Sequence, residues 1–77
     1  FEALQLILDE IGLEYINARN KFPPFHSLHE GYAILKEEVD ELWDDIKANK
    51  KDTARKEAIQ VAAMALAFVK DLYDGDI

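Results

Sequence analysis

The segment KEEVDELWDD, residues 36–45, places six carboxylates within ten positions, and only Lys36 offsets them. Each close pair of like charges on a helix costs roughly 0.2–0.5 kcal/mol. Taken alone, the segment is typical of a solvated helix face, since Glu-rich helices are common. A cation that neutralises part of the cluster is the other interpretation, and it requires further oxygen ligands elsewhere in the chain.

The spacing of these residues supplies such ligands. Glu38 and Glu41 are three residues apart and Glu37 and Glu41 are four apart, so both pairs share one helix face. Glu57 and Gln60, also three apart, stand at the start of an apolar run. If the two helices pack antiparallel through a short turn, the two motifs can lie opposite each other. A set made only of oxygen ligands predicts Mg²⁺, with Mn²⁺ as the alternative, and argues against zinc.

The first element that the sequence predicts is a helix from Phe1 to about Lys21. Its end is set by the segment at 22–25, because a proline disfavours helix in the residue before it. The apolar residues of this helix recur at intervals of three and four, which is typical of a stripe that packs on a core. They are Leu4, Ile7, Ile11, Tyr15, Ala18 and Phe22.

A second helix is predicted to begin after Ser27, with Ser27 as N-cap and Glu30 reaching back to complete a capping box. It should fade near Asn49. Its apolar residues alternate at intervals of four and three, the pattern of a seam that packs against other helices. They are Leu28, Tyr32, Leu35, Val39, Leu42 and Ile46.

A third helix is predicted from about Ala54 to Tyr73, with Asp52 or Thr53 as N-cap and Gly75 as the stop. In its sequence AIQVAAMALAFV, residues 58–69, eleven of twelve positions are apolar. A helix that is apolar all round must be buried all round, and two partner helices cannot surround it. We therefore expect other subunits to complete the packing.

Composition limits the class of protein. The 77 residues include no cysteine, which excludes disulfides and thiolate metal sites. The net charge of −7 argues against nucleic acid as a partner. The longest apolar run is too short to span a bilayer, and the sequence shows no signal peptide, so we expect a cytoplasmic protein without a membrane partner.

The two acidic motifs carry a family resemblance. EEVDE at 37–41, followed by EAIQ at 57–60, resembles the EExxE…ExxD pattern of the MazG-like all-α NTP pyrophosphohydrolases, and the likeness extends over roughly residues 27–72. It implies one helical domain over residues 1–77, which completes an antiparallel helical bundle as a dimer or a dimer of dimers. The implied reaction is Mg²⁺-dependent: a nucleoside triphosphate and water give the monophosphate and pyrophosphate.

The resemblance also implies roles for single residues. Glu38, Glu41 and Glu57 would hold the Mg²⁺, and Glu37 would be a further ligand or orient the attacking water. Gln60 stands where the family pattern has Asp. Its amide oxygen can ligate a cation, but it supplies no charge and cannot act as a base. A hydrogen bond from Gln60 to a neighbouring helix is the alternative.

The substrate contacts are open to more than one interpretation. Arg55 and Lys56 precede Glu57, which makes them the candidates for binding the triphosphate, although a surface role is the alternative. Trp43 borders the apolar seam and either stacks on a nucleobase or packs between subunits.

Two further alternatives concern the histidines and the function. His26 and His29 flank a helix start without a third soft ligand, so capping or exposure explains them better than a metal. A helical oligomerisation or interaction module with a degenerate metal site is the alternative function, and Gln60 is the feature that favours it. A plain cation-binding bundle is a third possibility.

Overall fold

A computed structural model describes residues 1–74 of the chain, with side chains through Leu72. The predicted stop at Gly75 lies outside the described residues. Within them all regular secondary structure is helical and no strand occurs, which confirms the predicted all-α class. The elements in order are α1 (Glu2–Lys21), α2 (Leu28–Lys47), α3 (Lys51–Val69) and a π-helical turn, η1 (Lys70–Asp74).

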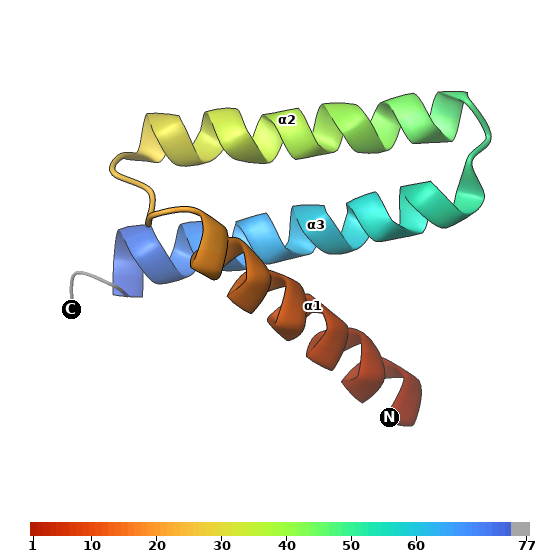
Figure 1. The fold of residues 1–77 in the computed structure, drawn as a ribbon, viewed down its shortest axis with the longest axis horizontal. Helices are drawn as coiled ribbons and strands as arrows, with labels where there is room; N and C mark the ends of the chain where they lie inside the picture. Colours follow the sequence, from red (N-terminus) through yellow and green to blue (C-terminus); the bar gives the residue numbers. More distant parts are fainter. Residues whose placement is uncertain (75–77) are drawn as a thin grey trace.

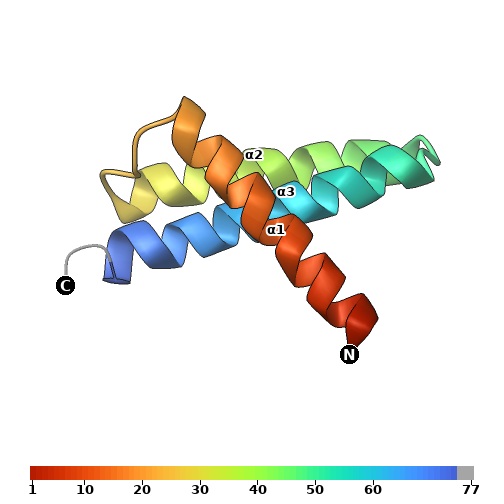
Figure 2. The same ribbon diagram turned by 60° about the horizontal axis from the view of Figure 1, so that its bottom comes forward.

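The helices are arranged in two layers. α2 and α3 run antiparallel side by side and form a hairpin, and α1 crosses one face of that hairpin (Figure 1). Turned by 60°, the molecule shows α1 lying across α3 with its N-terminal half projecting beyond the pair (Figure 2). α1 therefore covers only part of one face of the hairpin.

The start of α2 follows the predicted cap with one difference. The Glu30 backbone N–H donates to Ser27 Oγ at 3.0 Å, as an N-cap requires. The Glu30 carboxylate, however, accepts from the backbone N–H of His26 at 3.0 Å, so it reaches one residue further back than a capping box predicts. Both bonds fix the direction in which the chain leaves the proline segment and enters α2.

The turn between α2 and α3 is shorter than predicted. Asn49 adopts a left-handed backbone with φ of 57°, a conformation that Asn tolerates better than most residues. α3 consequently begins at Lys51 with Lys50 as N-cap, and the predicted N-caps Asp52 and Thr53 are wrong. The Thr53 hydroxyl instead donates to the Lys50 carbonyl oxygen at 3.2 Å.

Gly31 of α2 lies directly against Phe68 of α3. Gly31 is buried, and a Cβ at this position would come within 2.6 Å of the Phe68 ring. The absence of a side chain at Gly31 therefore lets the two helices approach here. No such neighbour lies within 4 Å of a Cβ placed on Gly12.

The buried core is small. Its apolar members all belong to α3: Ala63 at 0%, Met64 at 9% and Ala67 at 3% exposed. The predicted stripe of α1 packs only in its C-terminal half, where Tyr15 and Ala18 line a small cavity with Met64 and Ala67. This single chain does not bury the helix at 58–69 all round, since Leu66 is 42% and Val69 is 49% exposed. That other subunits cover its exposed side stays a prediction.

The C-terminal end of α1 is anchored by an ion pair to η1. Arg19 Nη2 lies 2.7 and 2.8 Å from the two carboxylate oxygens of Asp71, whose side chain is only 6% exposed. The backbone N–H of Phe25 donates to the same carboxylate at 3.0 Å, and the Arg19 guanidinium lies 5.2 Å from the Tyr15 ring centroid. One carboxylate thus joins α1, the proline segment and η1.

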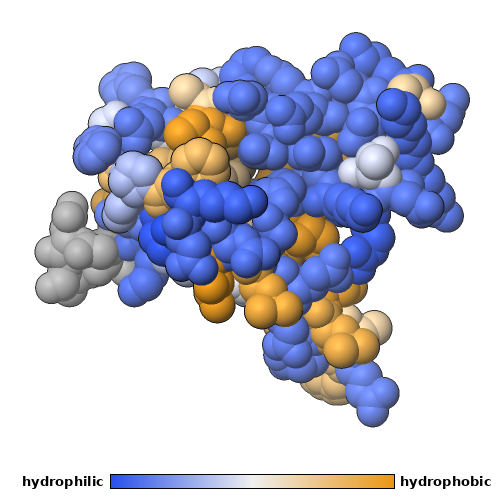
Figure 3. All heavy atoms as spheres, viewed as in Figure 1, coloured by the Kyte–Doolittle hydropathy of each residue, from blue (hydrophilic) through white to orange (hydrophobic). Residues whose placement is uncertain are grey.

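The N-terminal half of α1 is exposed by contrast. Apolar side chains gather along it in Figure 3, including Leu4 at 56% and Leu8 at 51% exposed. Among the described helices, none has the length and apolar character needed to cross a membrane.

Candidate metal centre

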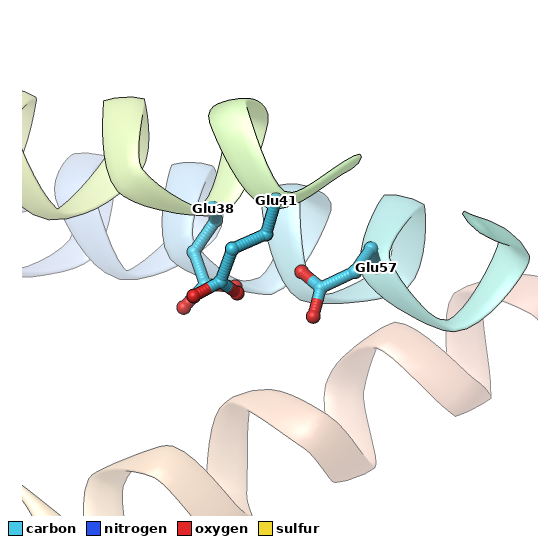
Figure 4. A group of neighbouring side chains, drawn as sticks. All are labelled: Glu38, Glu41 and Glu57. Carbon is cyan, nitrogen blue, oxygen red and sulfur yellow. The ribbon is translucent and has the colours of Figure 1, made fainter. Parts of the chain in front are cut away.

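Three carboxylates from two helices converge on one side of the hairpin. Glu38 and Glu41 extend from α2 and Glu57 extends from α3, toward the side on which α1 runs (Figure 4). One oxygen of each lies within 4.8 Å of the other two. The antiparallel hairpin creates this meeting, because it sets Glu57, early in α3, opposite the last turns of α2. The sequence prediction that the two motifs face each other agrees with this placement.

The carboxylates differ in their surroundings. Glu38 and Glu57 are half-buried, whereas Glu41 is exposed. Glu57 Oε2 is buried and has no hydrogen-bond partner in the described part of the chain. A buried carboxylate oxygen without a donor is costly, and a cation is the group that relieves this cost most directly.

The pKa of each of the three carboxyls is raised above its ordinary value. Burial is the largest cause for Glu38, and the charges of Glu41 and Glu37 add to it. For Glu41, partial desolvation is the largest cause of the raised pKa, and the charge of Glu57 is the second. For Glu57, burial and then Glu38 raise the pKa, with a further contribution from Asp45. Without a cation, the cluster therefore holds protons more tightly than isolated carboxyls do.

Glu37 and Gln60 lie beside this group and are not among its three carboxylates. Glu37 is exposed, and its charge raises the pKa of both Glu38 and Glu41, which places it near them. Gln60 is half-buried one helical turn after Glu57, on the same side of α3.

The predicted phosphate-binding residues are not part of the cluster. Arg55 pairs instead with Glu10 of α1, through Nη1–Oε2 at 2.7 Å and Nη2–Oε1 at 3.0 Å. In this conformation, its guanidinium joins α3 to the middle of α1. Lys56 is exposed on α3. The sequence did not predict that Glu10 pairs with Arg55, because 45 residues separate them and no short motif connects them.

Trp43 lies away from the three carboxylates. It is two residues from Glu41, and residues two apart on a helix point about 200° apart. Its side chain is 55% exposed, and Lys47 Nζ lies 5.6 Å from the ring centroid. This position does not bring Trp43 to the three carboxylates, and packing between subunits stays a prediction. His26, just before the N-cap of α2, and His29, in its first turn, are both exposed.

Comparison with protein-family models, curated proteins and solved structures found no match for the chain. The case for a function therefore depends on the chemistry of the site. Three carboxylates, one with a buried oxygen that lacks a donor, fit a small divalent cation that prefers oxygen ligands. Magnesium usually takes one or two protein carboxylates and completes its shell with water and substrate phosphate, so two of these three carboxylates would be enough to hold it. We call Glu38, Glu41 and Glu57 together the carboxylate corner.

Proposed function

We propose that this protein is a Mg²⁺-dependent nucleoside triphosphate pyrophosphohydrolase, which converts a nucleoside triphosphate and water into the monophosphate and pyrophosphate. The observation that carries the proposal is the convergence of Glu38, Glu41 and Glu57 from two helices, with Glu57 Oε2 buried and without a donor. The MazG-like spacing of the two acidic motifs selects this reaction among those that Mg²⁺ assists.

The resemblance implies the roles of the residues, and their positions are compatible with it. Glu38, Glu41 and Glu57 would hold Mg²⁺, with Mn²⁺ as a substitute, and Gln60 would offer an amide oxygen one turn further on. The ion supplies positive charge that neutralises the phosphates and the charge that develops in the reaction. Glu37, exposed beside Glu38 and Glu41, would orient a water molecule and accept its proton. The water oxygen bonds to phosphorus in line as the α–β anhydride bond breaks, and pyrophosphate leaves.

Arg55 would bind the triphosphate only after it leaves Glu10. The present pair between them is exposed, and exposed ion pairs contribute little to stability, so a polyanionic substrate can compete for the guanidinium. Lys56 remains the second candidate. Trp43 is better assigned to subunit packing than to the nucleobase, because it points about 200° around the helix axis from Glu41.

The proposed assembly is a homo-oligomer, either a dimer or a dimer of dimers, located in the cytoplasm. Its support is the small core of the single chain, which buries three apolar side chains of α3 and leaves many large ones exposed. A domain of this size needs a larger buried area to be stable.

An oligomerisation or interaction module is the second candidate function. Gln60 favours it, because an amide in place of the carboxylate that the family pattern has lowers the charge available to a metal. Such a module would keep the fold and lose the reaction.

Product analysis over a panel of canonical and modified nucleoside triphosphates tests the proposal. We expect monophosphate and pyrophosphate in equal amounts, with Mg²⁺ required. Diphosphate and orthophosphate would point to a different phosphohydrolase. No turnover of any member, combined with no Mg²⁺-dependent rise in melting temperature, would favour the interaction module.

A further inference from the structure

The side of the α2–α3 hairpin that α1 leaves uncovered is apolar. Its large side chains are between 42% and 62% exposed. We call this surface the bare face. Its members are Leu28, Tyr32, Val39, Trp43 and Ile46 of α2, with Ala58, Ala65, Leu66 and Val69 of α3.

The position of the bare face follows from the helical repeat. Residues two apart on a helix point about 200° apart. On α3, Val69 is therefore directed away from Ala67, which lines the cavity under α1. On α2, Trp43 is directed away from Glu41, which extends toward α1 (Figure 4). The bare face and the carboxylate corner thus lie on opposite sides of the same hairpin.

The two helices contribute side chains of different size to this surface. α2 presents only large ones, among them Tyr32 and Trp43, whereas α3 presents two alanines, Ala58 and Ala65, as well as Leu66 and Val69. An open hollow of about 370 Å³, lined by Leu28, His29, Tyr32 and Phe68, lies at one end. A two-fold axis parallel to the helices would place the large side chains of one copy on the alanines of the other.

The exposed area also agrees with a dimer. About half of each large side chain is exposed, which corresponds to roughly 100 Å² apiece. Seven such side chains offer on the order of 700 Å² per copy, close to the ~800 Å² that each partner buries in a stable complex. The members of the bare face are apolar, and the charge of Lys47 lies beside them, with Nζ 5.6 Å from the Trp43 ring centroid. An apolar partner surface therefore suits this face better than a charged one.

We propose that the bare face is the interface with a second copy of this chain, in which α2 of one copy packs on α3 of the other and α1 remains outside. The resulting core would contain four helices, and each carboxylate corner would lie outside it. The inference assigns a surface to the oligomer proposed above and depends on these exposed side chains alone. Assembly without hydrolysis, or hydrolysis by a monomer, would therefore separate the two proposals.

Sedimentation equilibrium with matched variants tests the interface. We expect a mass of twice the 8.8 kDa chain, or a multiple of that dimer. Tyr32→Glu and Ala58→Glu should each raise the dimer Kd by about 30-fold or more, since each buries a charge in the interface. Leu13→Glu is the control, because Leu13 is exposed to 64%, as Tyr32 is to 62%, and lies on α1. It should leave the Kd unchanged.

The parent protein supplies a second test that needs no variant. Trp43 is the only tryptophan, so its fluorescence reports on the bare face directly. We expect its emission to shift to longer wavelength as dilution separates the copies. A parent that is monomeric at every concentration would overturn the proposal, as would an oligomer that Leu13→Glu dissociates and Tyr32→Glu does not. Dissociation without any change in Trp43 emission would also exclude this face.

Discussion

The two sides of the α2–α3 hairpin differ in almost every physical property. One side carries the carboxylate corner and is partly covered by α1, whereas the other carries the exposed apolar side chains of the bare face. Both sides come from the same two helices, and residues two positions apart contribute to opposite sides: Glu41 belongs to the carboxylate corner and Trp43 lies on the bare face. Charge that needs a cation and apolar surface that needs a partner are thereby kept apart, so either can be altered without the other.

The largest expected difference in stability comes from replacing an alanine with glutamate at three positions: in the core, on the bare face and outside both surfaces. Ala63 is fully buried, so Ala63→Glu should abolish cooperative unfolding, because an unpaired buried charge costs more than a domain this small can lose. Ala65→Glu, on the bare face, should lower the melting temperature and remove its dependence on protein concentration. Ala33→Glu, at an exposed position of α2 outside both surfaces, should change little. Thermal denaturation followed by circular dichroism at two concentrations would show this order, and equal losses for all three would contradict it.

The two ion pairs of α1 allow a second comparison. Asp71→Asn removes the charge that pairs with Arg19 in a nearly buried position, and should cost about 1–3 kcal/mol of unfolding free energy. Glu10→Gln removes the exposed partner of Arg55 and should leave the unfolding free energy unchanged. Urea denaturation measures both. A larger effect at Glu10 would mean that α1 is held mainly by its middle.

Two glycines offer a matched pair in packing. Gly31→Ala would place a Cβ 2.6 Å from the Phe68 ring, and the separation of the helices should cost about 1–3 kcal/mol. Gly12→Ala meets nothing within 4 Å and should stabilise α1 by about 0.5–1 kcal/mol. Opposite signs are therefore expected for the same substitution in one denaturation series. Equal signs would show that α2 and α3 are not this close at Gly31.

The smallest expected effect is the dependence of stability on pH. The folded state raises the pKa of Glu38, Glu41 and Glu57, mainly through burial, so it binds protons more tightly than the unfolded state. Without metal, this contribution to stability is fully present below the ordinary carboxyl pKa of 4.5 and is lost as the pH rises through the raised values. Glu38→Gln should weaken this dependence. Saturating Mg²⁺ should reverse it, because the ion binds the ionised form.

Much of the fold could be predicted from local sequence signals. The proline pair, the Ser27 cap and the three-four spacing of apolar residues each act within a few residues, and the helices they predicted are present. The start of α3 was missed because it depends on the left-handed backbone of Asn49, which replaces a side-chain cap. The full length of the α1 stripe was also expected to pack, but the crossing angle of α1 lifts its N-terminal half away (Figure 2).

For the candidate site, the sequence predicted the features that depend on helical periodicity and missed a contact that depends on the position of α1. The spacing of Glu38 and Glu41, and the short turn that returns the chain to Glu57, follow from helical periodicity. The pairing of Arg55 with Glu10 did not, because it depends on where α1 crosses the hairpin. The sequence could have predicted that Trp43 points away from the carboxylate corner, since Trp43 and Glu41 are two positions apart on one helix.

The hydrolysis of nucleoside triphosphates by Glu41→Gln tests the central proposal most directly. The matched control is Asp44→Asn, which removes one charge from the same acidic segment at a position that is 71% exposed. At equal helical content, we expect Glu41→Gln to lose Mg²⁺-dependent release of monophosphate and pyrophosphate by on the order of 100-fold or more, while Asp44→Asn stays close to the parent. Equal pyrophosphate release by the parent and Glu41→Gln would show that the corner is not the catalytic metal site.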